Sequence, residues 1–96
     1  MSGTTRSSEG LDLRRRKILF RAWHRGMREM DLILGRFADG NIEQLSEPDL
    51  FEFETLMDLP DDQLLAWLTG EREVPAVHDG RLFRRLRAFQ SGQRDE

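Results

Sequence analysis

Apolar side chains recur every three or four residues along most of this chain, a spacing that places them on one face of an α-helix. The clearest repeat lies between residues 27 and 37, where apolar positions stand at i, i+3, i+7 and i+10 (Met27, Met30, Leu34 and Phe37). Residues branched at the β-carbon are scarce, and no stretch alternates cleanly between apolar and polar positions. The pattern therefore predicts helices and no strand.

Residues that start and stop helices place the boundaries. Gly26 fits the C′ position of the first helix, and the second helix begins directly after it. Ser46 followed by Asp49, with Pro48 between them, resembles a capping box that opens the third helix, and Pro60 marks the start of the fourth. The first helix is predicted from about Asp12 to His24 or Arg25, and the second from Met27 to the segment "ADGN". The third carries apolar residues from Leu50 to Met57, and Gly70 stops the fourth. The last helix spans about residues 77–90.

Five short helices suit the size of the chain. It has 96 residues, of which 38% are hydrophobic and 34% charged, a composition typical of one small globular domain. We therefore predict an all-α fold, a small compact five-helix bundle over residues 12–90, with flexible tails at residues 1–11 and 91–96. A core of this size packs one layer of apolar faces and leaves little room for an enclosed substrate.

The net charge of −3 hides a separation of charge along the chain. Residues 1–36 carry nine basic and four acidic side chains, residues 37–80 carry one and twelve, and residues 81–96 carry five and two. Two basic ends thus flank an acidic middle. There is no cysteine, and no apolar run approaches the roughly 20 residues that cross a bilayer. We expect a protein without stable membrane insertion, in the cytoplasm or, in a eukaryote, the mitochondrial matrix.

Few side chains have the spacing that catalysis or ligand binding requires. His24 and His78 stand alone, without the paired spacing of metal ligands, and no glycine-rich loop follows a strand. We therefore predict no metal, no cofactor of the protein's own and no enzymatic activity. The basic runs "RRRK" and "RLFRRLR" are suited to phosphates or an anionic membrane. The acidic middle would repel the same polyanion, so nucleic-acid binding is the weaker alternative.

The stretch "WHRGMREMD" places a glycine inside an otherwise continuous helical pattern. A local interpretation pairs Arg25 with Glu29, four residues apart, but such a pair leaves the glycine unexplained. If Gly26 instead turns the chain at a corner between two helices, it leaves a surface that another backbone can approach closely. Arg25, Arg28, Glu29 and Asp31 would surround that surface, which predicts a docking site for a protein partner.

Two segments carry a resemblance to a known family. Residues 21–37, "RAWHRGMREMDLILGRF", contain an R-G-x-x-E motif as Arg25, Gly26 and Glu29, and are similar to the succinate dehydrogenase flavinylation (assembly) factor family. Residues 50–70, "LFEFETLMDLPDDQLLAWLTG", resemble that family's acidic third helix and its D-D-x-x-L-x-x-W-L fourth helix, with a spacing that differs by one residue. The final helix is similar only in character. The resemblance covers roughly residues 14–90.

The resemblance implies a five-helix protein that binds the flavoprotein subunit of succinate dehydrogenase. We expect the protein to be a monomer. In some members the partner is fumarate reductase, and in both cases the protein promotes covalent attachment of FAD. The family's motif carries over to Arg25, Gly26 and Glu29, with Arg28 and Asp31 beside them. The histidine that receives the flavin would belong to the partner. A general helical adaptor and an antitoxin-like module remain as alternatives.

Overall fold

The computed structural model describes residues 10–92, and over that range it confirms the all-α prediction with five α-helices. Two short 3₁₀-helices, η1 and η2, lie between them, and no strand occurs in this range. The helices are α1 (Leu13–Trp23), α2 (Arg28–Asn41), η1 (Ile42–Gln44), α3 (Glu47–Met57), α4 (Asp61–Thr69), η2 (Ala76–His78) and α5 (Arg81–Gln90).

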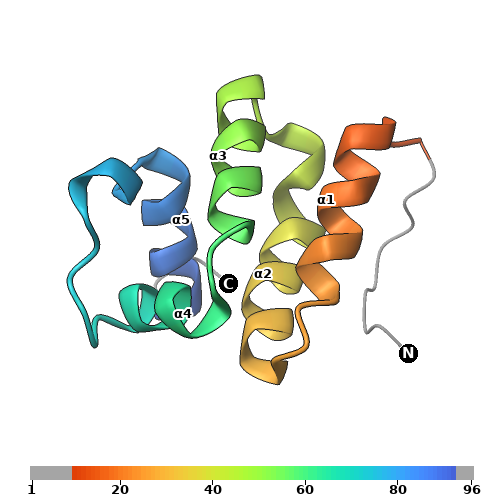
Figure 1. Cartoon of the computed structure of the whole chain (residues 1–96). Helices are drawn as coiled ribbons and strands as arrows, with labels where there is room; N and C mark the ends of the chain where they lie inside the picture. Colours follow the sequence, from red (N-terminus) through yellow and green to blue (C-terminus); the bar gives the residue numbers. More distant parts are fainter. Residues whose placement is uncertain (1–9, 93–96) are drawn as a thin grey trace.

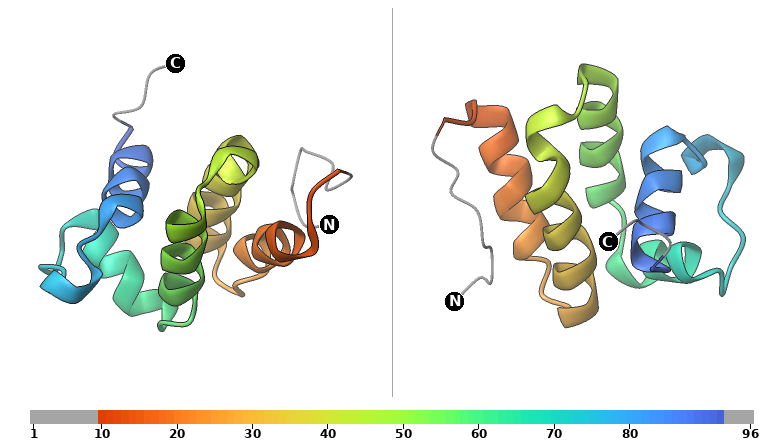
Figure 2. Two further views of the ribbon diagram at one scale, coloured as in Figure 1. Left: turned by 90° about the horizontal axis from the view of Figure 1, so that it is seen from above. Right: turned by 180° about the vertical axis from the view of Figure 1, so that it is seen from behind.

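The helices α2 and α3 form the middle of the molecule (Figure 1). The helix α1 packs beside α2 at one edge, while α4, η2 and α5 lie on the other side of α3 (Figures 1 and 2). Successive helices α1, α2 and α3 run in opposite directions, as short connections between them require. As a result, the turn between α1 and α2 lies at the same end of the bundle as the start of α4.

Local capping explains three of the helix boundaries. The predicted capping box is confirmed, because the Ser46 hydroxyl accepts from the backbone N–H of Asp49 and the Asp49 carboxylate accepts from that of Ser46. Nearer the N-terminus, the Asp12 side chain caps α1 by accepting from the backbone N–H of Arg15. Gly70 ends α4 with φ = +85°, a left-handed conformation that costs glycine little.

The predicted start of the last helix is wrong. We expected a continuous helix from about Val77, but η2 ends at His78 and α5 begins only at Arg81. The interruption has a physical reason, because Gly80 adopts an extended conformation as the N-cap of α5 and lies against the Glu52 side chain from α3. A helical pattern of apolar residues does not reveal such a contact between distant segments.

Apolar side chains from all five helices form one core. They include twelve side chains with less than 2% exposure: Phe53, Phe83, Ile18, Met30, Leu34, Ile42, Leu45, Leu50, Leu56, Leu64, Leu68 and Leu82. Near the centre, the rings of Phe37 and Phe53 meet edge to face with centroids 5.9 Å apart. Leu11, the last residue of the predicted N-terminal tail, is buried in this core. Residues 1–9 and 93–96 of the two predicted tails lie outside the described residues.

The carboxylate of Glu52 caps a helix other than its own. It accepts from the backbone N–H groups of Leu82 at 3.1 Å and Phe83 at 3.0 Å, in the first turn of α5. The N-cap residue Gly80 has no side chain with which to do this. A Cβ at position 80 would collide with the same carboxylate. Glu52 therefore joins the middle of α3 to the start of α5 and satisfies two amide groups that the helix leaves without partners.

Replacing Glu52 with alanine is expected to lower the free energy of unfolding by about 1–2 kcal/mol, the usual cost of losing a helix N-cap. Urea denaturation followed by circular dichroism measures this change. The control is Glu73→Ala, which removes an exposed carboxylate from the loop before η2 and should change stability by less than about 0.5 kcal/mol. Equal stability of the two variants would show that the cap contributes nothing.

Candidate functional site

The R-G-x-x-E motif forms the corner between α1 and α2. The helix α1 ends at Trp23 with His24 as its C-cap, so Arg25 occupies the C′ position that was predicted for Gly26. Gly26 follows one residue later. Gly26 has φ = +89°, and a Cβ built there would have no atom within 4 Å. The predicted left-handed corner is thus present. Its glycine is exposed and borders open space.

Arg25 points into the protein and does not pair with Glu29. Its guanidinium donates from Nε and Nη2 to Asp61 Oδ1, at 2.9 and 2.7 Å, and from Nη2 to the carbonyl oxygen of Met57 at 2.8 Å. The side chains of Arg25 and Asp61 are only 11% and 17% exposed. The local interpretation, an i, i+4 pair of Arg25 with Glu29, is therefore wrong. The corner breaks the helix between the two residues, so helical spacing no longer relates them.

Asp31 fixes the backbone of the same corner. Its Oδ1 accepts from the backbone N–H of Arg25 at 2.6 Å. The helix α2 has Met27 as its N-cap and no capping hydrogen bond from that side chain. Acids in its first turn, Glu29 and Asp31, complement the positive end of the helix dipole. Arg25 and Asp31 together hold α1, α2 and α4 in their relative positions.

The other three motif residues face solvent. Gly26, Arg28 and Glu29 are exposed within four consecutive positions. Within residues 10–92, no hydrogen bond or ion pair engages the side chain of Arg28 or Glu29. We call these three residues the docking corner. The motif thus divides into two half-buried residues that hold the turn, Arg25 and Asp31, and three exposed residues that are accessible to a partner.

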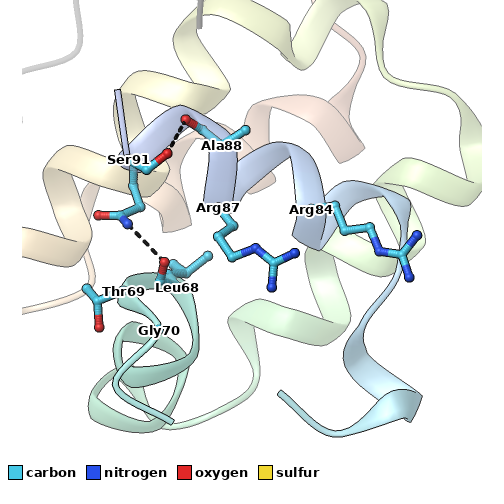
Figure 3. Close-up of a pocket in the computed structure, with 8 residues that line it drawn as sticks. Leu68, Thr69, Gly70, Arg84, Arg87, Ala88 and Ser91 are labelled. Atoms are coloured by element: carbon cyan, nitrogen blue, oxygen red, sulfur yellow. Dashed lines mark hydrogen bonds between the residues drawn. The ribbon is translucent and has the colours of Figure 1, made fainter. Parts of the chain in front are cut away.

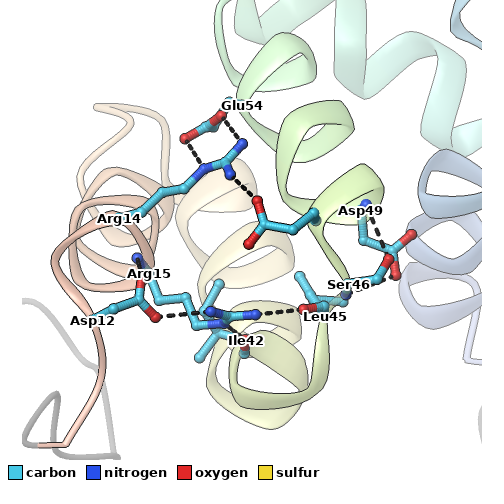
Figure 4. A network of polar contacts seen from close by, with 9 residues as sticks. Asp12, Arg14, Arg15, Ile42, Leu45, Ser46, Asp49 and Glu54 are labelled. Carbon is cyan, nitrogen blue, oxygen red and sulfur yellow. Dashed lines mark hydrogen bonds and ion pairs between the residues drawn. The ribbon is translucent and has the colours of Figure 1, made fainter.

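The basic run at the start of α1 is partly used inside the protein (Figure 4). Arg14 binds Glu54 through Nε and Nη2, at 3.1 and 2.9 Å, and also pairs with Glu47. These hydrogen bonds hold the pKa of the Glu54 carboxyl below its usual value. Arg15 pairs with Asp12 and donates to two backbone carbonyls of the segment after α2. Two of the four cations in the run therefore bind protein groups.

One arginine of α5, Arg85, lies against the protein and does not face outward. It donates to Asn41 Oδ1 at 2.9 Å and lies over the Phe37 ring, 5.5 Å from its centroid. Arg84, on the outer face, pairs with Asp79 at 2.9 Å. Two cations of the run "RLFRRLR", Arg84 and Arg85, therefore bind protein groups.

A groove of about 320 Å³ separates the end of α4 from α5 (Figure 3). Several of its polar side chains already make intramolecular contacts, since Gln90 donates to the carbonyl oxygen of Leu68 and Ser91 to that of Ala88. Arg87 lies over the Phe83 ring. The residues that line this groove form no pair of nucleophile and base.

Two further properties of the described residues bear on function. In the part of the chain that the structure describes, no three histidine, cysteine, aspartate or glutamate residues are grouped so as to hold a metal ion. None of the helices there is long and apolar enough to cross a membrane.

The chain is similar to known proteins over most of its length. Residues 16–90 match the sequence model of the family described as "Flavinator of succinate dehydrogenase". The chain is 32% identical over 80 residues to "FAD assembly factor SdhE" of Acetobacter pasteurianus, covering 83% of this chain and 73% of that protein. No solved structure matches the chain.

The mitochondrial relatives are longer. "Succinate dehydrogenase assembly factor 2, mitochondrial" of Dictyostelium discoideum is 41% identical over 61 residues, which cover 64% of this chain and 43% of that protein. The protein of the same name from Schizosaccharomyces pombe is 33% identical over 91 residues, covering 94% and 66%. The aligned region thus spans about half to two thirds of these relatives. Since the family model covers most of the chain, this protein belongs to the family of flavinators of succinate dehydrogenase.

Proposed function

We propose that this protein binds the flavoprotein subunit of succinate dehydrogenase and promotes covalent attachment of FAD to it. Membership of the flavinator family supports this activity, as do relatives named as FAD and succinate dehydrogenase assembly factors. The observation that carries the proposal is the docking corner. Its exposed glycine and two exposed charged side chains project from a turn that Arg25 and Asp31 hold in place.

The mechanism that we propose is one of positioning. The described residues offer no metal site, and the groove beside α5 offers no nucleophile paired with a base, so the acceptor group for the flavin is assigned to the partner. Docking at the corner would favour a partner conformation in which that acceptor faces the flavin ring. The protein would then act as a chaperone without contributing a catalytic group or binding FAD by itself. The same surface would serve a fumarate reductase flavoprotein.

Gly26→Arg and Glu29→Ala are each expected to reduce covalent flavin on the partner about tenfold or more. The arginine side chain would occupy the space that the partner backbone approaches, and the alanine would remove a charged contact. The measurement is in-gel flavin fluorescence of the denatured flavoprotein subunit, co-expressed with each variant or with no factor.

Gly70→Arg is the matched control for backbone strain. Gly70 has φ = +85°, close to the +89° of Gly26, and a Cβ there also borders open space. Both arginine variants pay the same cost of about 1–2 kcal/mol for a left-handed residue, but only Gly26→Arg should lose covalent flavin. Equal fluorescence with Gly26→Arg and Gly70→Arg would contradict docking at the corner. Unchanged fluorescence without any factor would favour a general adaptor instead.

A further inference from the structure

The outer face of α1 exposes two large apolar side chains. Leu13 is 58% exposed and Phe20 is 61% exposed, and they stand seven residues apart on one helix. Positions i and i+7 lie on the same face, two turns apart, so both side chains project from one side of α1. This helix forms the edge of the molecule, and no described element covers its outer side (Figures 1 and 2).

The exposed aromatic ring is held in place. Phe20 stacks on His24, with ring centroids 3.9 Å apart and an interplanar angle of 19°. His24 Nδ1 in turn donates to the carbonyl oxygen of Phe20 at 2.7 Å. An aromatic side chain fixed before binding loses little conformational freedom when a partner covers it. Such rings contribute strongly to protein interfaces.

The charged side chains between Leu13 and Phe20 are positive. Arg16 and Lys17 are exposed on α1, and neither side chain has a hydrogen bond or ion pair within the described part of the chain. By contrast, Arg14 and Arg21 pair with acids of α3 and its C-cap, Glu54 and Asp58. The acids of this chain thus neutralise the cations on the side of α1 that faces α3, and the outer face keeps its positive charge.

We propose that α1 carries a second contact surface for the same flavoprotein subunit, which we call the α1 stripe. It consists of Leu13, Arg16, Lys17, Phe20 and His24. The complementary surface on the subunit would be an apolar pocket with carboxylates at its rim. The stripe is continuous with the docking corner, because His24 precedes Gly26 by only two residues. One partner face can therefore cover both. This inference rests on the proposed function, since it concerns the same partner.

Phe20→Ala and Lys17→Glu test the stripe. Biolayer interferometry with the purified flavoprotein subunit would measure the Kd, and Phe20→Ala should raise it about tenfold or more. Lys17→Glu should slow association and reduce its dependence on ionic strength. The control is Val77→Ala, whose side chain is 82% exposed in η2, on the opposite side of the molecule from α1, and which should bind as wild type does. Circular dichroism should be unchanged in all three, because the replaced side chains lie at the surface.

The outcomes separate this inference from the proposed function. If Phe20→Ala and Lys17→Glu bind as wild type does while Glu29→Ala does not, the stripe is wrong and the docking corner stands. If wild-type protein does not bind the subunit, both are wrong. Sedimentation equilibrium gives a further test. A wild-type dimer that Phe20→Ala dissociates, with unchanged affinity for the subunit, would make the stripe a contact between two copies of this chain.

Discussion

Replacing Arg25 with methionine is expected to lower the free energy of unfolding by about 3 kcal/mol, near the lower end of the range for breaking a buried ion pair. The guanidinium makes three hydrogen bonds to Asp61 and the carbonyl of Met57, in a site where both charged side chains are less than one-fifth exposed. Methionine fills much of the same space, but it leaves the Asp61 carboxylate without its counter-ion. Urea denaturation followed by tryptophan fluorescence measures the change.

Arg28→Met is the matched control for this prediction. It removes the other arginine of the motif, which is exposed and has no partner within residues 10–92, and should change stability by no more than about 0.5 kcal/mol. A double-mutant cycle with Asp61→Asn then isolates the contribution of the pair. If Arg25→Met were as stable as Arg28→Met, the inward contacts of Arg25 would not hold the corner.

Replacing Gly35 with alanine is expected to destabilise the protein by about 2 kcal/mol, although alanine is normally the better residue inside a helix by about 1 kcal/mol. The indole of Trp23 lies directly on Gly35, so that a Cβ there would be under 3.0 Å from three ring atoms. The ring has little freedom to move, because it is 5% exposed and its Nε1 donates to Asp39 Oδ1 at 3.1 Å. Thermal unfolding by circular dichroism measures the loss.

Gly40→Ala, in the same helix, is expected to have the opposite effect on stability. A Cβ at Gly40 would have no atom within 4 Å, so only the helix propensity changes, and stability should rise by about 0.5 kcal/mol. If Gly35→Ala lowers the stability and Gly40→Ala raises it, the result would confirm that Trp23 requires a glycine at position 35. If both substitutions stabilised the protein, the close packing of α1 on α2 would be wrong.

The division of the motif affects how loss of activity should be interpreted. A variant of Arg25 or Asp31 changes the position of the corner itself, because these side chains bind Asp61 and the backbone of the turn. A variant of Glu29 removes a side chain that has no hydrogen bond or ion pair within the described part of the chain. Loss of covalent flavin with Glu29→Ala therefore reports on docking, whereas loss with Arg25→Met is expected from altered structure alone.

Much of the fold could be predicted because its signals are local. The apolar repeat of α2, the capping box at Ser46 and the left-handed glycines at positions 26 and 70 each depend on a few neighbouring residues. The start of α5 could not be predicted in the same way. It depends on the Glu52 carboxylate, 30 and 31 residues away from the amide groups that it accepts from.

The candidate site also depends on contacts between residues that are distant in the sequence. The sequence by itself determined that the motif lies at a helix–helix corner, because a glycine in a helical pattern is a local signal. Only the tertiary structure decided which motif side chains face inward. Arg25 and Asp61 are 36 residues apart, and a contact at that separation forms only when α1, α3 and α4 have packed together. Local preferences determine where helices begin and end, but the direction of a charged side chain depends on what distant segments place beside it.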